Sequence, residues 1–459
     1  MPLKNAMKSI YLWGRSLFHR FFENPLTRRI VKNSGYLFSA TGAAAIMSML
    51  QGILTARLLG PSDFGALGAI TVFTSTINRF ASFRMNEFVV RYVGHYEEQG
   101  DSARATAVFK SASYMEMCGS LVAFVLIVLL APLGATYIAH DSSLTPLFRI
   151  YGTIVLANLI SESANGLLQI FNRFKIIAII STMQSTVTLV LIVIAFFSNS
   201  GLMAILVAYM CGKIIGAIGV TFAALWQAGK VWGKKWWRTP VALLAPQRKS
   251  LLTFAFSTNI SSTISLIAKD SEVLWVSAFL GTTQAGYYKL ALALSNLLQL
   301  PVSPLPKATF PELSREIARH SWENIRYVLR QGSRLAATYS IPMTIGLVIF
   351  GPWLISTFYG SEYLPAYPAL VILLVGYTFV NIFYWNRVAL LSLGRPVFPT
   401  IVNFLGMVMK VAGIFLLVPQ FGYLAFAGLL SAYYIFTVGI AAARVLLDVR
   451  THLSKVENP

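Results

Sequence analysis

A repeat with a constant offset of 221 residues constrains this chain more than any other feature. The segments 59–65 and 280–286 match at a leucine and at both glycines. Further matches at this offset, or one residue beyond it, pair Gly201 with Gly422, Ala204 with Ala425, and Arg173 with Arg395. Each matched piece is a loop between apolar runs, so the repeat predicts two copies of a helical bundle. Duplicated bundles that face each other across a cleft are the usual plan of secondary transporters.

The composition places these bundles in a membrane. Hydrophobic residues make up 56% of the chain and charged residues only 12%, far from the average of soluble proteins. A length of 459 residues leaves room for about twelve spans of roughly 20 residues or more. The apolar runs predict twelve transmembrane helices, at 34–58, 64–90, 106–136, 147–171, 174–197, 202–228, 250–280, 284–311, 331–359, 367–393, 396–418 and 422–446.

The net charge of +20 is distributed in alternate loops. Lysine and arginine cluster in 1–33, in 229–249 and in the connection after the eighth span. The intervening loops hold neither residue; they lie at 60–63, 137–146, 198–201, 281–284, 360–366 and 419–421. By the positive-inside rule, this asymmetry predicts a multi-pass protein of the cell (inner) membrane with both termini in the cytoplasm. A nucleic-acid surface would not be segmented in this way, so no nucleic acid is expected as a partner.

The even number of spans per half sets the domain organisation. Both halves then enter the membrane from the same side, so the repeat is parallel rather than inverted. The predicted units are a basic amphipathic segment on the inner leaflet, two six-helix bundles joined by a basic Trp-rich linker, and a cytoplasmic tail, over residues 1–33, 34–228, 229–249, 250–447 and 448–459. A disordered basic tail is the alternative for 1–33.

Signals of catalysis are missing from the sequence. The chain contains no G-x-x-x-x-G-K-[ST] motif, so it is not expected to hydrolyse ATP, and no cofactor is predicted. Its outer loops are too short for a catalytic domain. Cys118 and Cys211 fit no metal spacing and are predicted to pack within the spans.

Cations outnumber acids within the predicted spans. The cations are Arg57, Arg79, Arg84, Lys213, Lys269, Lys289, Lys307, Arg387 and Lys410, and the acids are Glu87, Glu116, Glu162, Asp270 and Glu272. An unpaired buried cation is strongly penalised, so the surplus predicts an anionic substrate, with phosphate or diphosphate as the natural group. Local ion pairs are the alternative for Arg84 with Glu87 and for Lys269 with its acidic neighbours, and Arg57 could reach the outer surface.

Two further features concern energy coupling and gating. Glu116, Glu162 and Lys213 lie at intermediate membrane depth and are candidates for one ion-coupling network. A permanent Glu162–Lys213 salt bridge is an equally good alternative. In the eighth span, Pro301, Pro304, Pro306 and Pro311 predict a kinked or broken helix, which is either a gate or a static bend.

Residues 56–70, ARLLGPSDFGALGAI, together with twelve spans in two parallel halves, resemble the Wzx-type polysaccharide flippases. These belong to the multidrug/oligosaccharidyl-lipid/polysaccharide exporter superfamily, and the resemblance covers roughly residues 30–447. It implies an all-α membrane fold that moves a polyprenyl-diphosphate-linked oligosaccharide from the inner to the outer leaflet by alternating access. In that family the first, second, seventh and eighth spans line a cationic cleft. Here these spans hold Arg57, Arg79, Arg84, Lys269, Lys289 and Lys307.

The resemblance also implies partners: the anionic lipid-linked oligosaccharide, membrane lipids, and a polysaccharide polymerase or glycosyltransferases. Two other functions remain open. A multidrug or cation antiporter of the same fold is disfavoured because buried cations would repel cationic drugs. A membrane-embedded glycosyl- or acyltransferase would need large outer loops or an acid–histidine constellation, and the sequence has neither.

Overall fold

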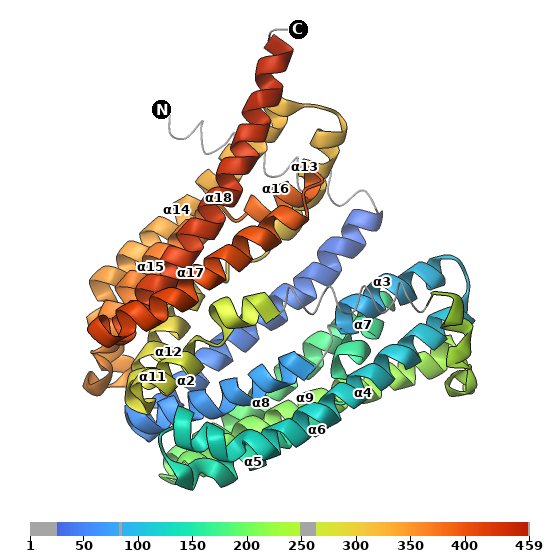
Figure 1. Cartoon of the computed structure of the whole chain (residues 1–459). Coiled ribbons are helices and arrows are strands. Elements are labelled where there is room, and N and C mark those ends of the chain that lie inside the picture. Colours follow the sequence, from blue (N-terminus) through green and yellow to red (C-terminus); the bar gives the residue numbers. More distant parts are fainter. Residues whose placement is uncertain (1–24, 82–84, 248–262, 458–459) are drawn as a thin grey trace, which may run out of the picture.

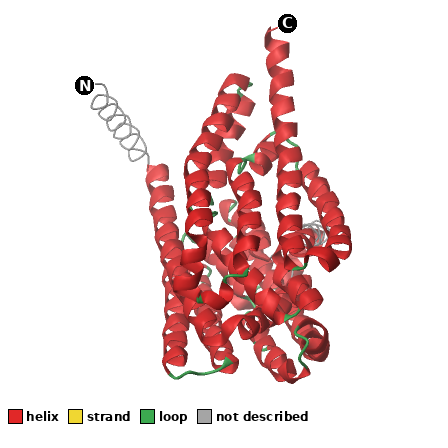
Figure 2. Ribbon diagram, turned by 90° about the vertical axis from the view of Figure 1, so that its left-hand side faces the viewer, coloured by secondary structure: helices red, strands yellow, loops and turns green. Residues whose placement is uncertain are grey.

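The computed structural model describes residues 25–81, 85–247 and 263–457. Across these residues the elements are helices and no strand occurs (Figure 2). Within the same residues, nine helices are long and apolar enough to cross a membrane. Leu129, Ile349 and Leu416 are each about two-thirds exposed (67, 65 and 69%), and they belong to a broad apolar surface. Surface of this kind is stable against lipid rather than water, so the predicted all-α, multi-pass membrane class is confirmed.

The helices form two bundles (Figure 1). The N-terminal bundle contains α2 (Pro25–Ala81), α3 (Met85–Glu98), α4 (Ser102–Leu133), η1 (Gly134–Ile138), η2 (Ser142–Leu144), α5 (Thr145–Gly152), α6 (Ile154–Ala157), α7 (Ser161–Ile170), α8 (Phe174–Phe197) and α9 (Leu202–Val231). The C-terminal bundle contains η5 (Leu266–Asp270), α11 (Glu272–Leu280), α12 (Thr282–Leu297), α13 (Leu305–Ala318), α14 (Trp322–Leu354), η6 (Ile355–Tyr359), η7 (Ser361–Tyr363), α15 (Ala366–Ile382), α16 (Asn386–Ser392), α17 (Val397–Phe421) and α18 (Tyr423–Glu457).

The 221-residue offset of the sequence recurs in the boundaries of these elements. The π-helical turns η1 and η6 begin at Gly134 and Ile355, which are 221 residues apart. The starts of α5 and α15 and the starts of α9 and α18 are separated by the same distance. Because corresponding helices of the two bundles begin at positions 221 residues apart, the repeat seen in the sequence extends across both bundles.

The predicted count of twelve spans exceeds the nine helices found in the described residues for three reasons. The first two predicted spans are two helices that meet at Gly60, whose φ/ψ of 69°/174° is not helical, and the label α2 covers both of them. The seventh begins in 250–262, outside the described residues. The eighth is broken as predicted: α12 ends at Leu297 and α13 starts at Leu305, with Pro301 and Pro304 in the turns between them. The count of twelve therefore stays a prediction.

The bundles meet at one end and diverge towards the other (Figure 1). At the end where they meet, Ala56 and Phe64 of α2 join the buried core of the C-terminal bundle, in a cluster that includes Tyr288 and Tyr363. Two further clusters each belong to a single bundle, one around Phe88 and the other around Trp385. We call the first region, around residues 56–65, 277–289 and 355–363, the closed end.

The linker and the tail extend the helical architecture. Trp232 and Trp236 pack against Phe109 of α4, and Lys110 Nζ donates hydrogen bonds to two linker carbonyls, at 2.7 and 2.6 Å. The linker turns η3 (Trp236–Arg238) and η4 (Val241–Gln247) therefore lie on the N-terminal bundle. The predicted tail continues α18 to Glu457. Residues 1–24 of the predicted amphipathic segment lie outside the described residues.

Candidate functional site

The closed end is built from the two copies of the sequence repeat. Gly60 and Gly281 adopt nearly the same left-handed backbone, with φ/ψ of 69°/174° and 88°/172°. This region favours glycine because a Cβ atom would be strained there. Pro61 follows the first bend, where its fixed φ suits the start of a helix and its missing N–H costs nothing.

Beyond these bends, α2 and α12 cross at the repeat-related glycines Gly65 and Gly286. A Cβ atom on Gly65 would lie 1.7 Å from the carbonyl oxygen of Thr282, and one on Gly286 would lie 2.1 Å from the carbonyl oxygen of Pro61. Both obstacles are backbone atoms, so no side-chain rotation could relieve the overlap. The two bundles therefore touch backbone to backbone at this crossing.

Polar side chains also connect the bundles at the closed end. The Arg57 guanidinium donates a hydrogen bond to the carbonyl oxygen of Thr357. The hydroxyl of Tyr363 donates to the carbonyl oxygen of Ala56 at 3.0 Å. The ammonium of Lys289 donates to the Phe64 carbonyl oxygen at 2.9 Å and lies 3.8 Å from the centre of the Phe64 ring. Arg57 and Lys289, two of the predicted substrate-binding cations, are thus located in contacts that hold the closed end together.

A second connection between the bundles is an ion pair. Arg79 of α2 lies 2.5 Å from the Asp270 carboxylate at the end of η5, and the two side chains are 47 and 35% exposed. The neighbouring Lys269 is exposed as well. Arg79, one of the six cations predicted for the cleft, therefore lies in an accessible ion pair between the bundles, and Lys269 is adjacent in sequence to its partner. Arg84 and the side chain of Lys307 lie outside the described residues.

The segment that carries Asp270 also carries a buried charge cluster. Glu272, the first residue of α11, forms an ion pair with Lys410 of α17 and accepts a hydrogen bond of 2.6 Å from the Tyr288 hydroxyl. Lys410 Nζ also donates to the Ala268 carbonyl oxygen, at 2.5 Å in the π-helical turn η5. Both charged side chains are almost fully buried, at 1 and 2% exposure. Wide turns of this type inside helices are frequent at functional sites.

Glu116 and Glu162 of the N-terminal bundle act as helix caps in succession. The buried Glu116 carboxylate accepts hydrogen bonds from the backbone N–H groups of Glu162 and Ser163, at 2.8 and 2.9 Å, and from the Ser163 hydroxyl. These groups form the start of α7, where unpaired N–H groups attract a carboxylate. Glu162 in turn accepts from the backbone N–H of Met85, the first residue of α3, at 3.0 Å.

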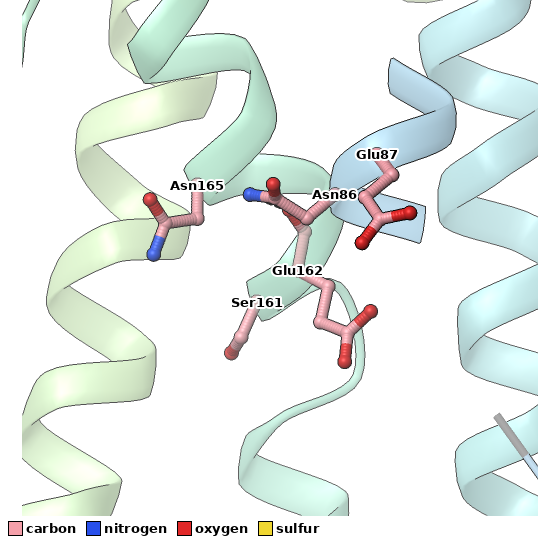
Figure 3. A pocket seen from close by; sticks show the side chains of 5 residues that line it. All are labelled: Asn86, Glu87, Ser161, Glu162 and Asn165. Atoms are coloured by element: carbon pink, nitrogen blue, oxygen red, sulfur yellow. Dashed lines mark hydrogen bonds between the residues drawn. The ribbon is translucent and has the colours of Figure 1, made fainter. Parts of the chain in front are cut away.

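The Glu162 carboxylate borders a polar cavity of about 400 Å³ between α3 and α7 (Figure 3). Its lining consists of Asn86, Glu87, Ser161, Glu162 and Asn165. Lys213 does not pair with Glu162; its ammonium lies 5.8 Å from the ring centre of Tyr151. The Glu162–Lys213 salt bridge considered as an alternative is therefore wrong, whereas a coupling role for the three residues stays a prediction.

Sequence reasoning named the membrane-embedded acids Asp270 and Glu272 but assigned neither to the site. Local neutralisation by Lys269 was the alternative to its role in the cleft, whereas the structure pairs the two acids with the distant Arg79 and Lys410. The available signal was the run Asp270–Ser271–Glu272 inside an otherwise apolar span. Over the described parts of the chain, no group of three or more histidine, cysteine or acidic residues could hold a metal ion.

The fold is shared with known membrane transporters. A multidrug resistance transporter of the MATE family in an inward-facing conformation superposes with a TM-score of 0.70 at 13% identity, covering 90% of this chain and 96% of that one. The lipid II flippase MurJ in an inward closed conformation superposes with a TM-score of 0.68 at 16% identity, covering 90 and 87%. These similarities define the class: a multi-pass membrane protein with a transporter or flippase fold.

The family follows from the sequence match. The family model described as "Polysaccharide biosynthesis protein" matches residues 30–317, and the chain belongs to that family. The inner membrane protein YghQ of Escherichia coli is 22% identical over 354 residues, which is 77% of this chain and 99% of that protein. The family assignment agrees with the resemblance noted in the sequence.

Proposed function

We propose that the protein moves a polyprenyl-diphosphate-linked oligosaccharide from the inner to the outer leaflet of the cytoplasmic membrane by alternating access. The observation that carries this proposal is the accessible Arg79–Asp270 pair between the bundles. A diphosphate offers the same two-oxygen face to a guanidinium as a carboxylate does, and with more negative charge. The substrate would therefore take the place of Asp270 at Arg79.

The Arg79–Asp270 ion pair differs from the buried Glu272–Lys410 pair in the free energy needed to break it. An exposed ion pair contributes about 0–1 kcal/mol, so a diphosphate can displace Asp270 at little cost, and the released carboxylate is solvated. Breaking a buried pair such as Glu272–Lys410 costs about 3–5 kcal/mol. We therefore assign substrate binding to Arg79 and a structural role to Lys410. The proposal agrees with the polysaccharide biosynthesis family and with the fold shared with a lipid II flippase.

The function is tested in liposomes that contain the purified protein and a fluorescent polyprenyl-diphosphate-linked oligosaccharide. A membrane-impermeant glycosidase added outside should then reach sugar from both leaflets, whereas protein-free vesicles protect the inner pool. Replacing Arg79 with alanine should slow translocation by about tenfold or more, because a hydrogen bond to a charged group contributes roughly 1.5–3 kcal/mol. Arg79→Lys should retain part of the rate because the charge remains while the planar fork is lost.

Arg104→Ala is the matched control for this experiment. Arg104 pairs with Asp101 at exposures of 49 and 34%, close to those of Arg79 and Asp270, but within one bundle. The Arg104→Ala variant should leave the translocation rate unchanged. Full translocation by Arg79→Ala would refute the assigned residue but not the function. Failure of the intact protein to move the lipid, with efflux of cationic compounds instead, would favour an antiporter, and covalent change of the glycan would favour a transferase.

The orientation of the protein is a second prediction. We propose that the closed end faces outward and both termini face the cytoplasm, because lysine and arginine are confined to alternate loops. After Cys118 and Cys211 are replaced, single cysteines at the exposed positions Asn199 and Thr283 should react with an impermeant thiol reagent added to intact cells. A cysteine at the exposed His320 should react only after permeabilisation. Labelling of His320→Cys in intact cells would show that the orientation is the reverse of the one predicted.

A further inference from the structure

A cavity of about 340 Å³ lies in the C-terminal bundle, outside the site described above. It is bordered by α14, by the junction of α15 and α16, and by α18. Its lining combines the polar side chains of Arg326, Arg330 and Ser333 with an apolar wall formed by Leu329, Phe383, Trp385 and Leu446. Cavities that combine cations with an apolar wall suit amphipathic anions.

The two arginines of this cavity differ from Arg315, Arg319 and Arg395 of the same bundle, which form ion pairs. They are four residues apart on one face of α14, where like charges repel by roughly 0.2–0.5 kcal/mol. In the described part of the chain, no carboxylate forms an ion pair with either guanidinium. By contrast, ion pairs join Arg315 to Glu312, Arg319 to Glu316, and Arg395 to Asp448. Arg326 and Arg330 therefore line the cavity without a carboxylate partner among the described residues.

The serine of the cavity is held in place by a buried tryptophan. Trp385, which is 2% exposed, donates its indole N–H to Ser333 Oγ at 2.7 Å. Because this oxygen acts as an acceptor, the Ser333 hydroxyl keeps its own hydrogen for a second partner. Two guanidinium groups and one hydroxyl donor therefore line the same cavity, which is the donor set that a phosphate needs.

The apolar wall identifies the kind of phosphate. Leu446 is 46% exposed, and the neighbouring Leu447 is 56% exposed on the same helix. Arg326 and Arg330 precede the apolar run of α14 that starts at Leu335, which corresponds to headgroup depth. Basic pockets between transmembrane helices at this depth bind anionic lipid headgroups. We propose that this cavity binds the phosphodiester headgroup of an anionic phospholipid, with its chains along α18.

The proposal is tested with the purified full-length protein in a neutral detergent. The probes are phosphatidylglycerol, zwitterionic phosphatidylcholine and inorganic phosphate, and the readouts are the melting temperature and lipid adducts in native mass spectrometry. Phosphatidylglycerol alone should raise the melting temperature and remain bound. In the Arg326→Gln/Arg330→Gln variant its affinity should fall by about tenfold or more, because charge-assisted hydrogen bonds are lost.

The control variant is Arg315→Gln/Arg319→Gln, which removes the same charge from arginines that already have partners, and it should bind the lipid normally. Ser333→Ala should weaken binding by a smaller factor. Equal binding of phosphatidylglycerol to the cavity variant and the control would overturn the proposal. If inorganic phosphate raised the melting temperature as much as phosphatidylglycerol does, the cavity would be a site for soluble anions instead. If phosphatidylcholine did so, the net negative charge of the lipid would not be needed for binding.

Discussion

Replacing Lys410 with methionine is expected to destabilise the protein by about 3–5 kcal/mol, because it leaves Glu272 as an uncompensated charge in the core. The carboxylate would keep the 2.6 Å hydrogen bond from Tyr288, but it would lose its only cationic partner among the described residues. Glu272→Gln should have an effect of similar size, since Lys410 would then contact only the Ala268 carbonyl oxygen and a neutral amide. Unfolding in mixed micelles with increasing denaturing detergent measures both changes.

The combination Glu272→Gln/Lys410→Met distinguishes a lost charge balance from lost packing. Because no net charge remains buried, the double variant should recover most of the stability that either single variant loses. The exposed pair Arg315–Glu312 is the matched control, and its single variants should change stability by about 0–1 kcal/mol. If the double variant is as unstable as the sum of the single variants, the cost arises from packing and not from charge.

Replacing Gly65 with alanine is expected to separate the bundles at the closed end. The added methyl group would lie 1.7 Å from the Thr282 carbonyl oxygen, so the backbones of α2 and α12 have to move apart. Overpacking usually costs about 1–3 kcal/mol, and this obstacle is backbone, so we expect the upper part of that range. The melting temperature should fall as the crossing loosens.

Gly52→Ala is the control within α2, because a Cβ atom there meets nothing within 4 Å. In a helix interior this change should stabilise by roughly 0.5–1 kcal/mol. Gly286→Ala should resemble Gly65→Ala, since its Cβ atom would lie 2.1 Å from the Pro61 carbonyl oxygen. Unchanged melting temperatures in both variants of the crossing would mean that the bundles do not depend on this contact.

Much of the fold follows from the sequence because its main determinants are local. The apolar runs indicate where helices cross the membrane, and the break after α12 follows from prolines that cannot continue a helix. The repeat predicted two copies of one bundle, and the boundaries of η1 and η6 reproduce its offset. The boundary between the first two predicted spans also follows from the sequence, because Gly60 adopts a left-handed backbone between the two helices of α2.

The site was less predictable because a sequence gives the depth of a charge in the membrane but not its direction around the helix. Arg57 and Arg79 were both predicted for the cationic cleft, yet Arg79 is in an accessible ion pair and Arg57 donates to a backbone carbonyl at the closed end. Neutralisation of Asp270 by the adjacent Lys269 was one alternative from the sequence. The actual partner comes from 191 residues away, which only the tertiary packing of the bundles determines.

At the crossing of Gly65 and Gly286, the residues on the two sides can differ because both sides belong to one polypeptide. In a dimer of identical half-length chains, a residue at the symmetry axis would meet its own copy, and every substitution there would enter the contact twice. In one continuous polypeptide each side changes independently. Asp63 and Phe64 on one side correspond to Gln284 and Ala285 on the other, so charge and bulk differ where the backbones agree. The two bundles therefore meet through equivalent backbones but unlike side chains, so the contact between them is not symmetric.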